Sequence, residues 1–436
     1  MSSAKLLKTD ILIAGGGIIG LSIARALSTL PNKPHITVLE KDKTLGNHGS
    51  TLNSGVLHSG IYYTPGSFKA RHCPIGNRLL TKYCLDNKLP ILQCGKLIVA
   101  KDTQEVEKIN ELYERAVTNG VPVKLVDKEE ALQIEPHLGT NLQFPMIWSP
   151  STSVASPSAI FEHLLKDVQG IDNIQILNGE GYKRLINNSP TSNTIETTQN
   201  TVIETPKFIN CGGLYADRIA HDFNEGKEYA LIPLKGLYMV DEVPYKEYGL
   251  KTVIYPIPPL KTNNFLGVHT TLTTDGKLKL GPTAVPSFWR EDYEGFKTFK
   301  FDEFAEIITQ YIKIGFSSKV FWYLNLLWNE IKKSSRTYFI KEGQKLINVY
   351  DKGGPNENPK FKRGKSAIRT QLINKKDHSF MNDFIILDRG SHVHFLNMAS
   401  PGWTSAMSLA EDMKTNIQEG LSFEEILKRV NENRKK

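Results

Sequence analysis

Cysteine is scarce in this 436-residue chain, and long apolar runs are missing. A disulfide framework is typical of far shorter secreted chains, and no two cysteines here form a Cys-x-x-Cys pair. No apolar stretch reaches the ~18 residues that a membrane-spanning helix needs. We therefore expect ordinary thiols in a reducing compartment, no metal site and no spanning helix. The four cysteines are Cys73, Cys84, Cys94 and Cys211.

Acidic side chains are outnumbered by basic ones, 46 against 54, which gives a net charge of +8. A basic balance suits an anionic small molecule, a nucleic acid or an acidic membrane surface. The chain has no arginine-rich stripe with interleaved aromatic residues. The charge alone does not choose between an anionic substrate and an acidic membrane surface, and we expect no nucleic-acid partner.

A glycine-rich turn follows the first apolar strand of the chain. The strand covers 10–14, the turn is Gly15–Gly20, and residues 21–27 continue with helical apolar spacing. A second apolar strand, 36–39, ends in Glu40. This strand–turn–helix–strand order is the context in which a G-x-G-x-x-G pattern predicts dinucleotide binding.

Each glycine of this turn has its own physical role. Gly15 permits the tight turn, Gly17 lets the backbone approach a pyrophosphate, and Gly20 lets the helix pack closely on the strand. Free N–H groups at the helix start favour an anion, and Glu40 can accept hydrogen bonds from a ribose. The motif disfavours NADP but does not separate FAD from NAD. The predicted contacts are Gly15, Gly17, Ile18, Ile19, Gly20, Glu40 and Lys41.

A second glycine-rich stretch, Gly49–Tyr63, reads GSTLNSGVLHSGIYY. It resembles a segment of the FAD-dependent L-2-hydroxyglutarate dehydrogenase/oxidase family, which belongs to the D-amino-acid oxidase/glycine oxidase superfamily. The resemblance runs from about Thr9 to Met413 and implies FAD as the cofactor. Shorter stretches similar to the same family are Phe68–Ala70, Val253–Pro258, Phe265–Thr270 and Leu280–Pro282.

The resemblance also implies further FAD contacts. They come from the stretch just quoted, from the glycines after the apolar strand 208–211, and from the C-terminal segment 397–406. A helix starting in that last segment would stabilise negative charge on the flavin with its free N–H groups. The residues are Thr51, Asn53, Ser54, Gly55, Gly212, Gly213, Gly402, Trp403 and Thr404.

The predicted fold is α/β, with a Rossmann-like FAD-binding domain and an inserted substrate domain built on an antiparallel or mixed sheet. We expect the FAD-binding domain to comprise 1–90, 150–225 and 366–436, and the substrate domain to comprise 91–149 and 226–365. Strands of one separate antiparallel sheet are expected, with a hairpin at Asp275-Gly276. They are 237–240, 252–255, 265–271 and 278–280.

Four local patterns allow further expectations. Pro74 should kink or restart the helix expected over 67–86, because proline removes a helical hydrogen bond. The polar stretch 187–205 is typical of a hairpin tip or a mobile loop. Residues 301–334 should be mostly helical, and their aromatic side chains flanked by lysines belong either to the core or to a membrane-contacting surface. The segment 350–365 is expected to be a polar loop.

Oxidation of a 2-hydroxy acid needs a base for the hydroxyl proton and cations for the carboxylates. His58 is the predicted base because it lies in the stretch that the resemblance places beside the flavin, and because histidine titrates near neutral pH. His269, on the inserted sheet, is the competing candidate. Arg369 is predicted to bind carboxylate through its planar guanidinium. Secondary candidates for substrate contacts are Tyr62, Lys235 and Tyr255.

The resemblance implies oxidation of L-2-hydroxyglutarate to 2-oxoglutarate, with electrons passed to a quinone-like acceptor or to oxygen. Two alternatives stay open: a related flavoenzyme acting on an amino acid or on glycerol 3-phosphate, and a non-enzyme similar to prenyl-protein escort factors. Eukaryotic members of the family are mitochondrial, yet the short leader before Asp10 is no convincing transit peptide. The expected location is mitochondrial for a eukaryotic chain, and otherwise cytoplasmic or peripheral to a membrane.

Overall fold

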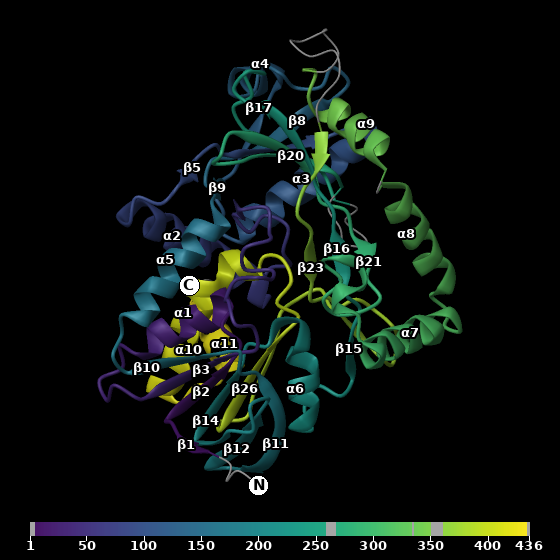
Figure 1. Cartoon of the computed structure of the whole chain (residues 1–436). Coiled ribbons are helices and arrows are strands. Elements are labelled where there is room, and N and C mark those ends of the chain that lie inside the picture. Colours follow the sequence, from purple (N-terminus) through teal and green to yellow (C-terminus); the bar gives the residue numbers. More distant parts are fainter. Residues whose placement is uncertain (1–4, 259–266, 334, 350–360, 434–436) are drawn as a thin grey trace.

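A six-stranded sheet forms the base of the molecule (Figure 1). The computed structural model describes residues 5–258, 267–333, 335–349 and 361–433. All neighbouring strands of this sheet run parallel except the last pair. The prediction of an α/β fold with a Rossmann-like sheet is confirmed. In spatial order the strands are β10 (Ile174–Asn178), β3 (Ile36–Glu40), β2 (Ile11–Ala14), β14 (Lys207–Asn210), β26 (His392–Leu396) and β25 (Ile385–Asp388).

Helices pack on this sheet through small residues. An added Cβ at Gly20 of α1 (Ile18–Leu27) would lie 2.0 Å from the Gly15 carbonyl oxygen, so only glycine allows α1 to sit this close to the preceding turn. Gly76 does the same between α2 (Phe68–Asp86) and α10 (Gly402–Glu419), where a Cβ would lie 2.1 Å from the Thr404 carbonyl oxygen. Two further helices complete this part: α5 (Pro157–Gln169) and α11 (Phe423–Asn433).

The expected restart of α2 at Pro74 is wrong, whereas the alternative of a kink stays a prediction. The helix runs unbroken from Phe68 to Asp86 with Pro74 inside it. Pro74 has no N–H to donate, but the first turn of α2 does not depend on that hydrogen bond. Ser67 accepts from the Ala70 N–H, and Asp383 accepts from the N–H groups of Phe68 and Lys69.

The polar stretch after α5 forms strands of a small sheet. β11 (Tyr182–Ser189), β12 (Ser192–Thr197) and β13 (Val202–Thr205) form an antiparallel meander, and β1 (Leu6–Lys8) pairs with β13 in parallel. The hairpin expectation is thus confirmed, and the mobile-loop alternative is wrong. α6 (Ala216–Asp222) follows β14 through a short 3-10 turn, Gly213–Tyr215.

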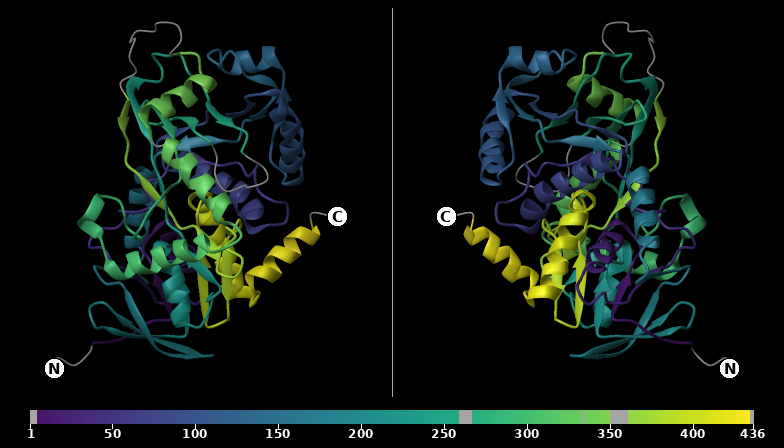
Figure 2. Two further views of the ribbon diagram at one scale, coloured as in Figure 1. Left: turned by 90° about the vertical axis from the view of Figure 1, so that its right-hand side faces the viewer. Right: turned by 90° about the vertical axis from the view of Figure 1, so that its left-hand side faces the viewer.

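The upper part of the molecule contains two larger sheets (Figures 1 and 2). One has the order β18-β6-β8-β7 and the other β19-β20-β17-β22. The expectation of one antiparallel sheet is wrong, because β18 pairs in parallel with β6 instead of joining β19. The bounds are β18 (Val253–Pro256), β6 (Lys96–Ala100), β8 (Gln143–Ser149), β7 (Lys124–Val126), β19 (His269–Leu272), β20 (Lys277–Gly281), β17 (Met239–Pro244) and β22 (Phe361–Arg363).

Two helices and several short strands complete this upper part. Asp102 caps α3 (Thr103–Thr118) and Asp127 caps α4 (Lys128–Ile134), each through its carboxylate. Short ladders join β4 (Val56–Leu57), β9 (Ser153–Ala155) and β5 (Ile91–Leu92); β21 (Val285–Pro286), β16 (Leu234–Gly236) and β23 (Ala367–Arg369); and β15 (Tyr229–Leu231) with β24 (Leu372–Asn374).

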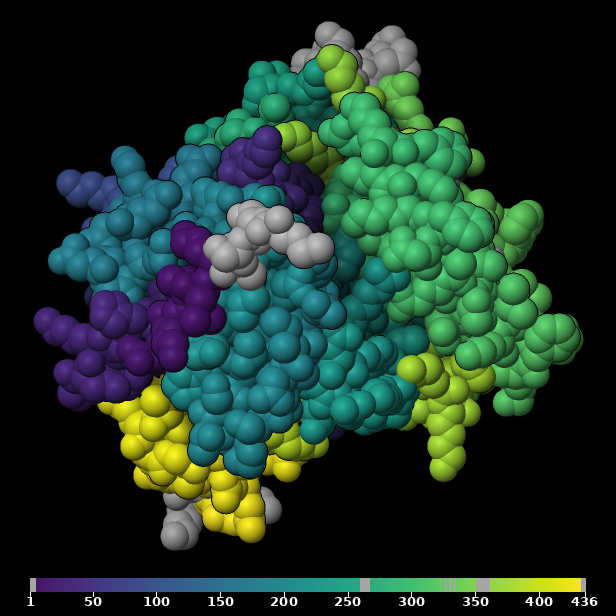
Figure 3. Space-filling view, turned by 60° about the horizontal axis from the view of Figure 1, so that its bottom comes forward, coloured from purple at the N-terminus to yellow at the C-terminus, as the bar shows by residue number. Residues whose placement is uncertain are grey.

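Three helices line the right-hand edge in Figure 1: α7 (Phe301–Gly315), α8 (Val320–Lys333) and α9 (Arg336–Leu346). In the space-filling view they make up a broad part of the surface (Figure 3). The prediction of helix here is confirmed. Two expectations concern parts outside the described residues: the loop over 350–360 and the Phe265-Leu266 start of an expected strand. The remainder of the loop expected over 350–365 is partly wrong, because Phe361–Arg363 forms strand β22 against β17.

Candidate active site

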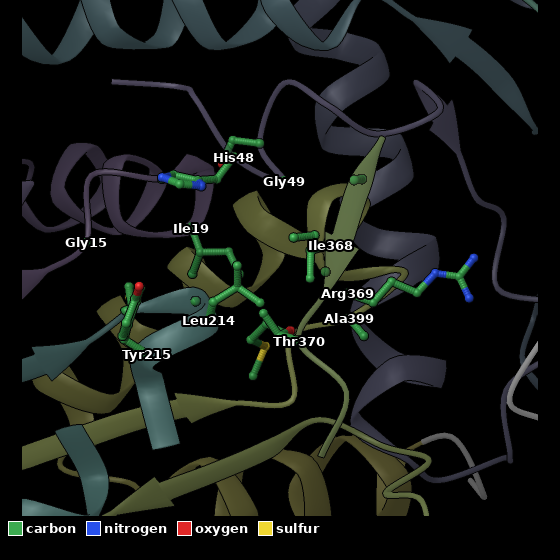
Figure 4. A pocket seen from close by; sticks show the side chains of 18 of the residues that line it. Gly15, Ile19, His48, Gly49, Leu214, Tyr215, Ile368, Arg369, Thr370 and Ala399 are labelled. Atoms are coloured by element: carbon green, nitrogen blue, oxygen red, sulfur yellow. The ribbon is translucent and has the colours of Figure 1, made fainter. Parts of the chain in front are cut away.

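A cavity of about 840 Å³ extends from the carboxyl ends of the parallel strands to the inserted sheets. Gly15 and Glu40 line it where the strands end, and His269 lines it on the inserted side. Figure 4 shows Gly15 and Tyr215 on one side of this cavity and Arg369 on the other. Ligands of open parallel sheets bind at such strand ends.

The first turn is shaped for close approach of a ligand. Gly15 has a φ of +111°, and an added Cβ there would lie 2.3 Å from the Cys211 carbonyl oxygen. A Cβ at Gly17 would stand in the cavity wall, 3.1 Å from Ser50 Oγ. The N-cap residue of α1, Gly17, has no side chain to cap the helix, and the Ile18 N–H donates to Ser50 Oγ at 2.9 Å. This cradle fits a pyrophosphate.

Glu40 ends β3 beside that cradle. One of its carboxylate oxygens accepts from the Gly16 N–H at 3.1 Å and the other from the Asp42 N–H at 3.0 Å. These bonds fix the carboxylate while leaving it lone pairs for a ribose hydroxyl. A dinucleotide therefore fits the residues present at this end of the cavity.

A charged cluster closes the same end. Lys41 Nζ lies 2.7 Å from Glu291 and 2.9 Å from Asp42. Burial lowers the pKa of Lys41, but the two carboxylates outweigh it and raise the pKa above its usual value. Glu291 comes from the inserted part of the chain, so this ion pair joins that part to the sheet.

The loop carrying His58 is fixed by its backbone. The His58 N–H donates to Thr404 Oγ1 at 3.3 Å, and the His58 carbonyl accepts from the Cys73 thiol at 3.2 Å. At Gly60, φ is +101° and a Cβ would lie 2.7 Å from the Pro74 ring, so the chain can turn beside α2 only with glycine. His58 Nε2 lies 3.4 Å from Ser400 Oγ at the start of the C-terminal segment.

His269 reaches the same cavity from β19. Its Nδ1 lies 3.0 Å from the Gly267 carbonyl oxygen, which can only accept; the proton of the neutral imidazole is therefore on Nδ1, and Nε2 is left as a hydrogen-bond acceptor. The His269 imidazole stacks on the Tyr255 ring with 3.7 Å between the ring centroids. The centroid of the His58 ring lies 6.5 Å from that of Tyr255, and these two rings meet edge to face. Burial, with the nearby cations Lys96 and Arg369, lowers the pKa of both histidines to about 3. Both imidazoles are therefore neutral at physiological pH.

The C-terminal helix α10 begins at the cavity. Gly402, Trp403 and Thr404 line the wall, and no side chain caps the helix. The positive end of its dipole thus points to the part of the cavity that holds His58.

Most predicted site residues line the cavity, and five do not. Gly20 and Gly55 lie behind it, Thr51 donates to the Gly46 carbonyl, and Lys235 pairs with Asp292 at 3.2 Å. The fifth, Tyr62, packs between the cores. The predicted residues that line the cavity are Gly15, Gly17, Ile18, Ile19, Glu40, Lys41, Asn53, Ser54, His58, Gly212, Gly213, Tyr255, His269, Arg369, Gly402, Trp403 and Thr404.

Sequence reasoning missed several polar side chains of the wall. Ser50 belongs to the quoted glycine-rich stretch, and its position next to Gly49 was the available signal. Tyr238 and Tyr293 carry no motif, and folding alone brings them to the cavity. Ser400 stands in the C-terminal segment but had no assigned role.

The comparison with protein families decides the identity. The model described as FAD dependent oxidoreductase matches residues 10–413. The chain belongs to the FAD-dependent oxidoreductase family. The dinucleotide that this flavoprotein uses is therefore FAD, in agreement with the fit of the cradle.

Curated relatives of this oxidoreductase cover nearly its whole length. L-2-hydroxyglutarate dehydrogenase, mitochondrial, from Bos taurus is 33% identical over 429 residues, covering 94% of this chain and 89% of the relative. L-2-hydroxyglutarate dehydrogenase from Escherichia coli (strain K12) is 30% identical over 410 residues, covering 94% and 93%. These relatives support the main interpretation and neither alternative.

Solved structures agree on the fold of the flavoprotein. L-alpha-glycerophosphate oxidase from Mycoplasma pneumoniae, solved with FAD bound, has a TM-score of 0.71 at 22% identity and covers 94% of this chain and 95% of its own. Glycine oxidase from Geobacillus kaustophilus has a TM-score of 0.66 at 14% identity and covers 95% and 96%. At these identities the likeness concerns the fold alone.

Proposed function

We propose that this flavoprotein oxidises L-2-hydroxyglutarate to 2-oxoglutarate. The observation that carries the proposal is the near-full-length similarity to L-2-hydroxyglutarate dehydrogenases. The cavity supports it, because two neutral histidines and an arginine share one space with the dinucleotide cradle. A 2-hydroxy dicarboxylate needs this combination of a proton acceptor and cations.

The cofactor is held by the first turn and by α10 in this proposal. Gly15, Gly17 and the N–H of Ile19 bind the pyrophosphate beside Ile18, whose own N–H donates to Ser50 Oγ, and Glu40 binds a ribose. Remaining contacts come from Ser50, Asn53, Ser54, Gly212, Gly213 and Thr404. When bound, FAD accepts the hydride that leaves the hydroxyl-bearing carbon.

His58 accepts the hydroxyl proton of the substrate in this mechanism. It enters the reaction neutral, and its fixed backbone leaves only the ring to move. Burial makes an imidazolium costly in the free protein, whereas a bound dianion nearby would stabilise it and raise the His58 pKa. His269 Nε2, an acceptor by its bond to Gly267, is the alternative position for the proton.

Arg369 binds one carboxylate of the substrate. It lies on β23, and its guanidinium can form two parallel hydrogen bonds to a carboxylate. Its charge also lowers the pKa of both histidines, so it belongs to the same electrostatic group.

We also propose that electrons leave at a membrane, to a quinone-like acceptor, with oxygen as the alternative acceptor. Among the described residues, no helix is long and apolar enough to span a bilayer. Yet α8 exposes a continuous apolar stripe, with Phe321 at 83%, Leu324 at 54%, Trp328 at 58% and Ile331 at 46% exposure. Their spacing of three or four residues puts them on one face.

Basic side chains accompany this stripe. Phe316, at the end of α7, is 91% exposed, and Lys313 is exposed beside it. Lys332 Nζ lies 4.8 Å from the Trp328 ring centroid. Apolar side chains with flanking lysines suit the surface of an anionic bilayer. By the names of the relatives, we expect a mitochondrial location only for a eukaryotic chain.

The proposed reaction is tested by product analysis. Purified protein is incubated with L-2-hydroxyglutarate and an artificial electron acceptor, and 2-oxoglutarate is measured by mass spectrometry. Glycerol 3-phosphate, glycine and L-proline serve as comparison substrates. Formation of 2-oxoglutarate at a higher kcat/KM than any comparison reaction supports the proposal, whereas turnover of a comparison substrate alone contradicts it.

A further inference from the structure

Lys96 is a fully buried lysine next to the two histidines. It opens β6, which lies between β18 and β8 in its sheet, and its exposure is 0%. Its Nζ has no hydrogen-bond partner, and no carboxylate among the described residues pairs with it. Burying a charge without a partner costs free energy, and a bound anion would offset that cost. Lys96 is therefore a candidate group for binding an anionic ligand.

Two tyrosines surround this ammonium. Nζ lies 4.7 Å from the ring centroid of Tyr62 and 5.0 Å from that of Tyr255. The hydroxyl oxygens of both tyrosines are buried; that of Tyr62 has no hydrogen-bond partner in the described structure, and that of Tyr255 has only the Thr271 hydroxyl beside it, so each can still donate its own hydrogen. The ammonium thus lies against two aromatic rings and makes no hydrogen bond to a described residue, and each of the two rings carries a hydroxyl group that can donate.

This group adjoins the proposed catalytic residues through Tyr255. The Tyr255 ring stacks on His269 and lines the cavity. Lys96 Nζ lies 5.0 Å from the centroid of the same ring but does not line the cavity itself. The charge of Lys96 also acts on His58 and His269, whose pKa values it helps to lower. Arg369 lines the cavity directly and therefore lies closer to its open space than Lys96 does.

We propose that Lys96, with the hydroxyl groups of Tyr62 and Tyr255, binds the distal carboxylate of the substrate, the one farther from the hydroxyl-bearing carbon. This inference rests on the proposed function and adds the residues that select a dicarboxylate. A carboxylate has four lone pairs, which an ammonium and two hydroxyl groups can share. Arg369 then binds the other carboxylate, the one attached to the hydroxyl-bearing carbon. Lys96 and Tyr62 lie outside the cavity wall in this structure, so the proposal requires the Tyr62 side chain to move aside when the substrate binds.

The assignment predicts a pH dependence of binding. Burial lowers the pKa of Lys96 to about 7, so the free protein carries the ammonium below that pH and the neutral amine above it. His58 and His269 have pKa values near 3, and burial raises the pKa of the Cys73 thiol and of both tyrosines, so these groups do not titrate in this range. Burial lowers the pKa of Lys69, which also lies near Cys73, to about 8, so only the alkaline loss that disappears in Lys96→Met is assigned to Lys96. Binding of a dicarboxylate should therefore weaken as pH rises from 7 to 9.

The experiment compares Lys96→Met and Lys96→Arg with the wild-type holoenzyme. Binding of 2-oxoglutarate to the oxidised protein is followed by the change in flavin absorbance, and binding of 2-oxovalerate, which lacks the distal carboxylate, is measured alongside. Lys279→Met, a partly buried lysine of β20 outside the cavity wall, is the matched control. Anaerobic flavin reduction by L-2-hydroxyglutarate and L-2-hydroxyvalerate is measured on the same samples.

Lys96→Met should raise the Kd of 2-oxoglutarate at least roughly 30-fold at pH 6.5 and leave that of 2-oxovalerate within about threefold. The alkaline loss of binding should disappear in Lys96→Met and move to higher pH in Lys96→Arg. Equal losses for both ligands, or none, would overturn the assignment while wild-type reduction by L-2-hydroxyglutarate upholds the proposed function. If the wild type is not reduced by L-2-hydroxyglutarate, the proposed function and this assignment both fall.

Discussion

At the scale of single residues, the two histidines differ in what fixes them. The Gly267 carbonyl sets the tautomer of His269. Thr404 and Cys73 fix the backbone of His58, but among the described residues its ring makes only one hydrogen-bond contact, a long one of 3.4 Å from Nε2 to Ser400 Oγ. His58 can therefore adjust its ring to a bound substrate. His269 acts as a rigid hydrogen-bond acceptor held against Tyr255.

Replacing His58 by alanine should slow flavin reduction by about 10²–10⁴-fold while the cofactor stays bound. The reason is the loss of the proposed acceptor of the hydroxyl proton. Stopped-flow absorbance under anaerobic conditions measures the rate, and the flavin-to-protein ratio verifies cofactor content.

His269→Ala is the companion variant for that measurement. It should weaken substrate binding more than it slows the limiting rate. A normal limiting rate in His58→Ala combined with a strongly reduced one in His269→Ala would place the base on the inserted sheet instead.

At the scale of elements, a buried ion pair joins α6 to the segment before α7. Arg290, with 0% side-chain exposure, donates to both carboxylate oxygens of Asp217 at 2.6 and 3.0 Å and to Glu306 at 2.8 Å. The guanidinium holds the pKa of Asp217 below its usual value. This contact anchors the inserted helices to the sheet that carries the cofactor cradle.

Asp217→Asn should destabilise the protein by about 1.5–3 kcal/mol, because Arg290 loses its two-pronged carboxylate partner but keeps Glu306. A thermal unfolding scan at pH 7 should show a Tm lowered by several degrees. Because the folded-state pKa of Asp217 is depressed, its stabilisation is present above the unfolded value near 4 and is lost as pH falls below it. A variant with an unchanged Tm would contradict the anchoring role.

The exposed stripe of α8 gives a second prediction at this scale. Replacing Phe321 and Trp328 together by serine should weaken co-sedimentation with anionic vesicles roughly tenfold or more. Full burial of one such side chain in the bilayer contributes about 1.5–3 kcal/mol, and the variant loses this contribution at both positions. Binding of the wild type should also fall with added salt.

Ile186→Ser provides the matched control for that variant, since Ile186 is 48% exposed on β11, away from α8. It should bind vesicles like the wild type. Equal binding of all three proteins, or wild-type binding to neutral vesicles only, would contradict membrane contact through this face.

Sequence reasoning succeeded for elements whose signals are local. Gly15, Gly17 and Gly20 predicted the cradle because a tight turn and close packing require glycine at those places. The strand pairing of β18 was missed because its partner β6 lies more than a hundred residues earlier, and only the tertiary fold decides which edge is available. Pro74 misled for a related reason, because Asp383 anchors the first turn of α2 from far along the chain.

The candidate site shows the same division. His58 and His269 were found through their sequence context, whereas Lys96 has no motif and becomes evident only as a buried ammonium without a partner. Conversely, Lys235 matched a residue type suited to an anionic substrate, but its pairing with Asp292 outside the cavity wall cannot be deduced from spacing.

At the scale of the whole molecule, burial of neutral histidines makes stability depend on pH. The pKa of His72 is lowered to about 4 and those of His58, His269 and His394 to about 3, in each case chiefly by burial. Unfolded histidine titrates near 6.5, so the unfolded chain binds more protons between about pH 6.5 and 4. The folded state is therefore increasingly disfavoured as pH falls through that range.

Urea unfolding at several pH values tests this. The free energy of unfolding should fall from pH 7 to pH 5 by roughly 1 kcal/mol per pH unit for each such histidine. His394→Asn, which lies on β26 away from the cavity wall, should reduce that slope. Constant stability between pH 7 and 5 would show that folding does not lower the pKa values of these imidazoles.

The whole chain combines an FAD cradle with a cavity suited to a 2-hydroxy dicarboxylate, and one anaerobic measurement tests this combination most directly. The purified holoenzyme is mixed with L-2-hydroxyglutarate without oxygen while the flavin spectrum is recorded. The expected result is complete loss of the oxidised flavin absorption with one 2-oxoglutarate formed per flavin, and no such loss with the D enantiomer. Flavin that stays oxidised with L-2-hydroxyglutarate but is reduced by an amino acid or glycerol 3-phosphate would contradict the proposed substrate.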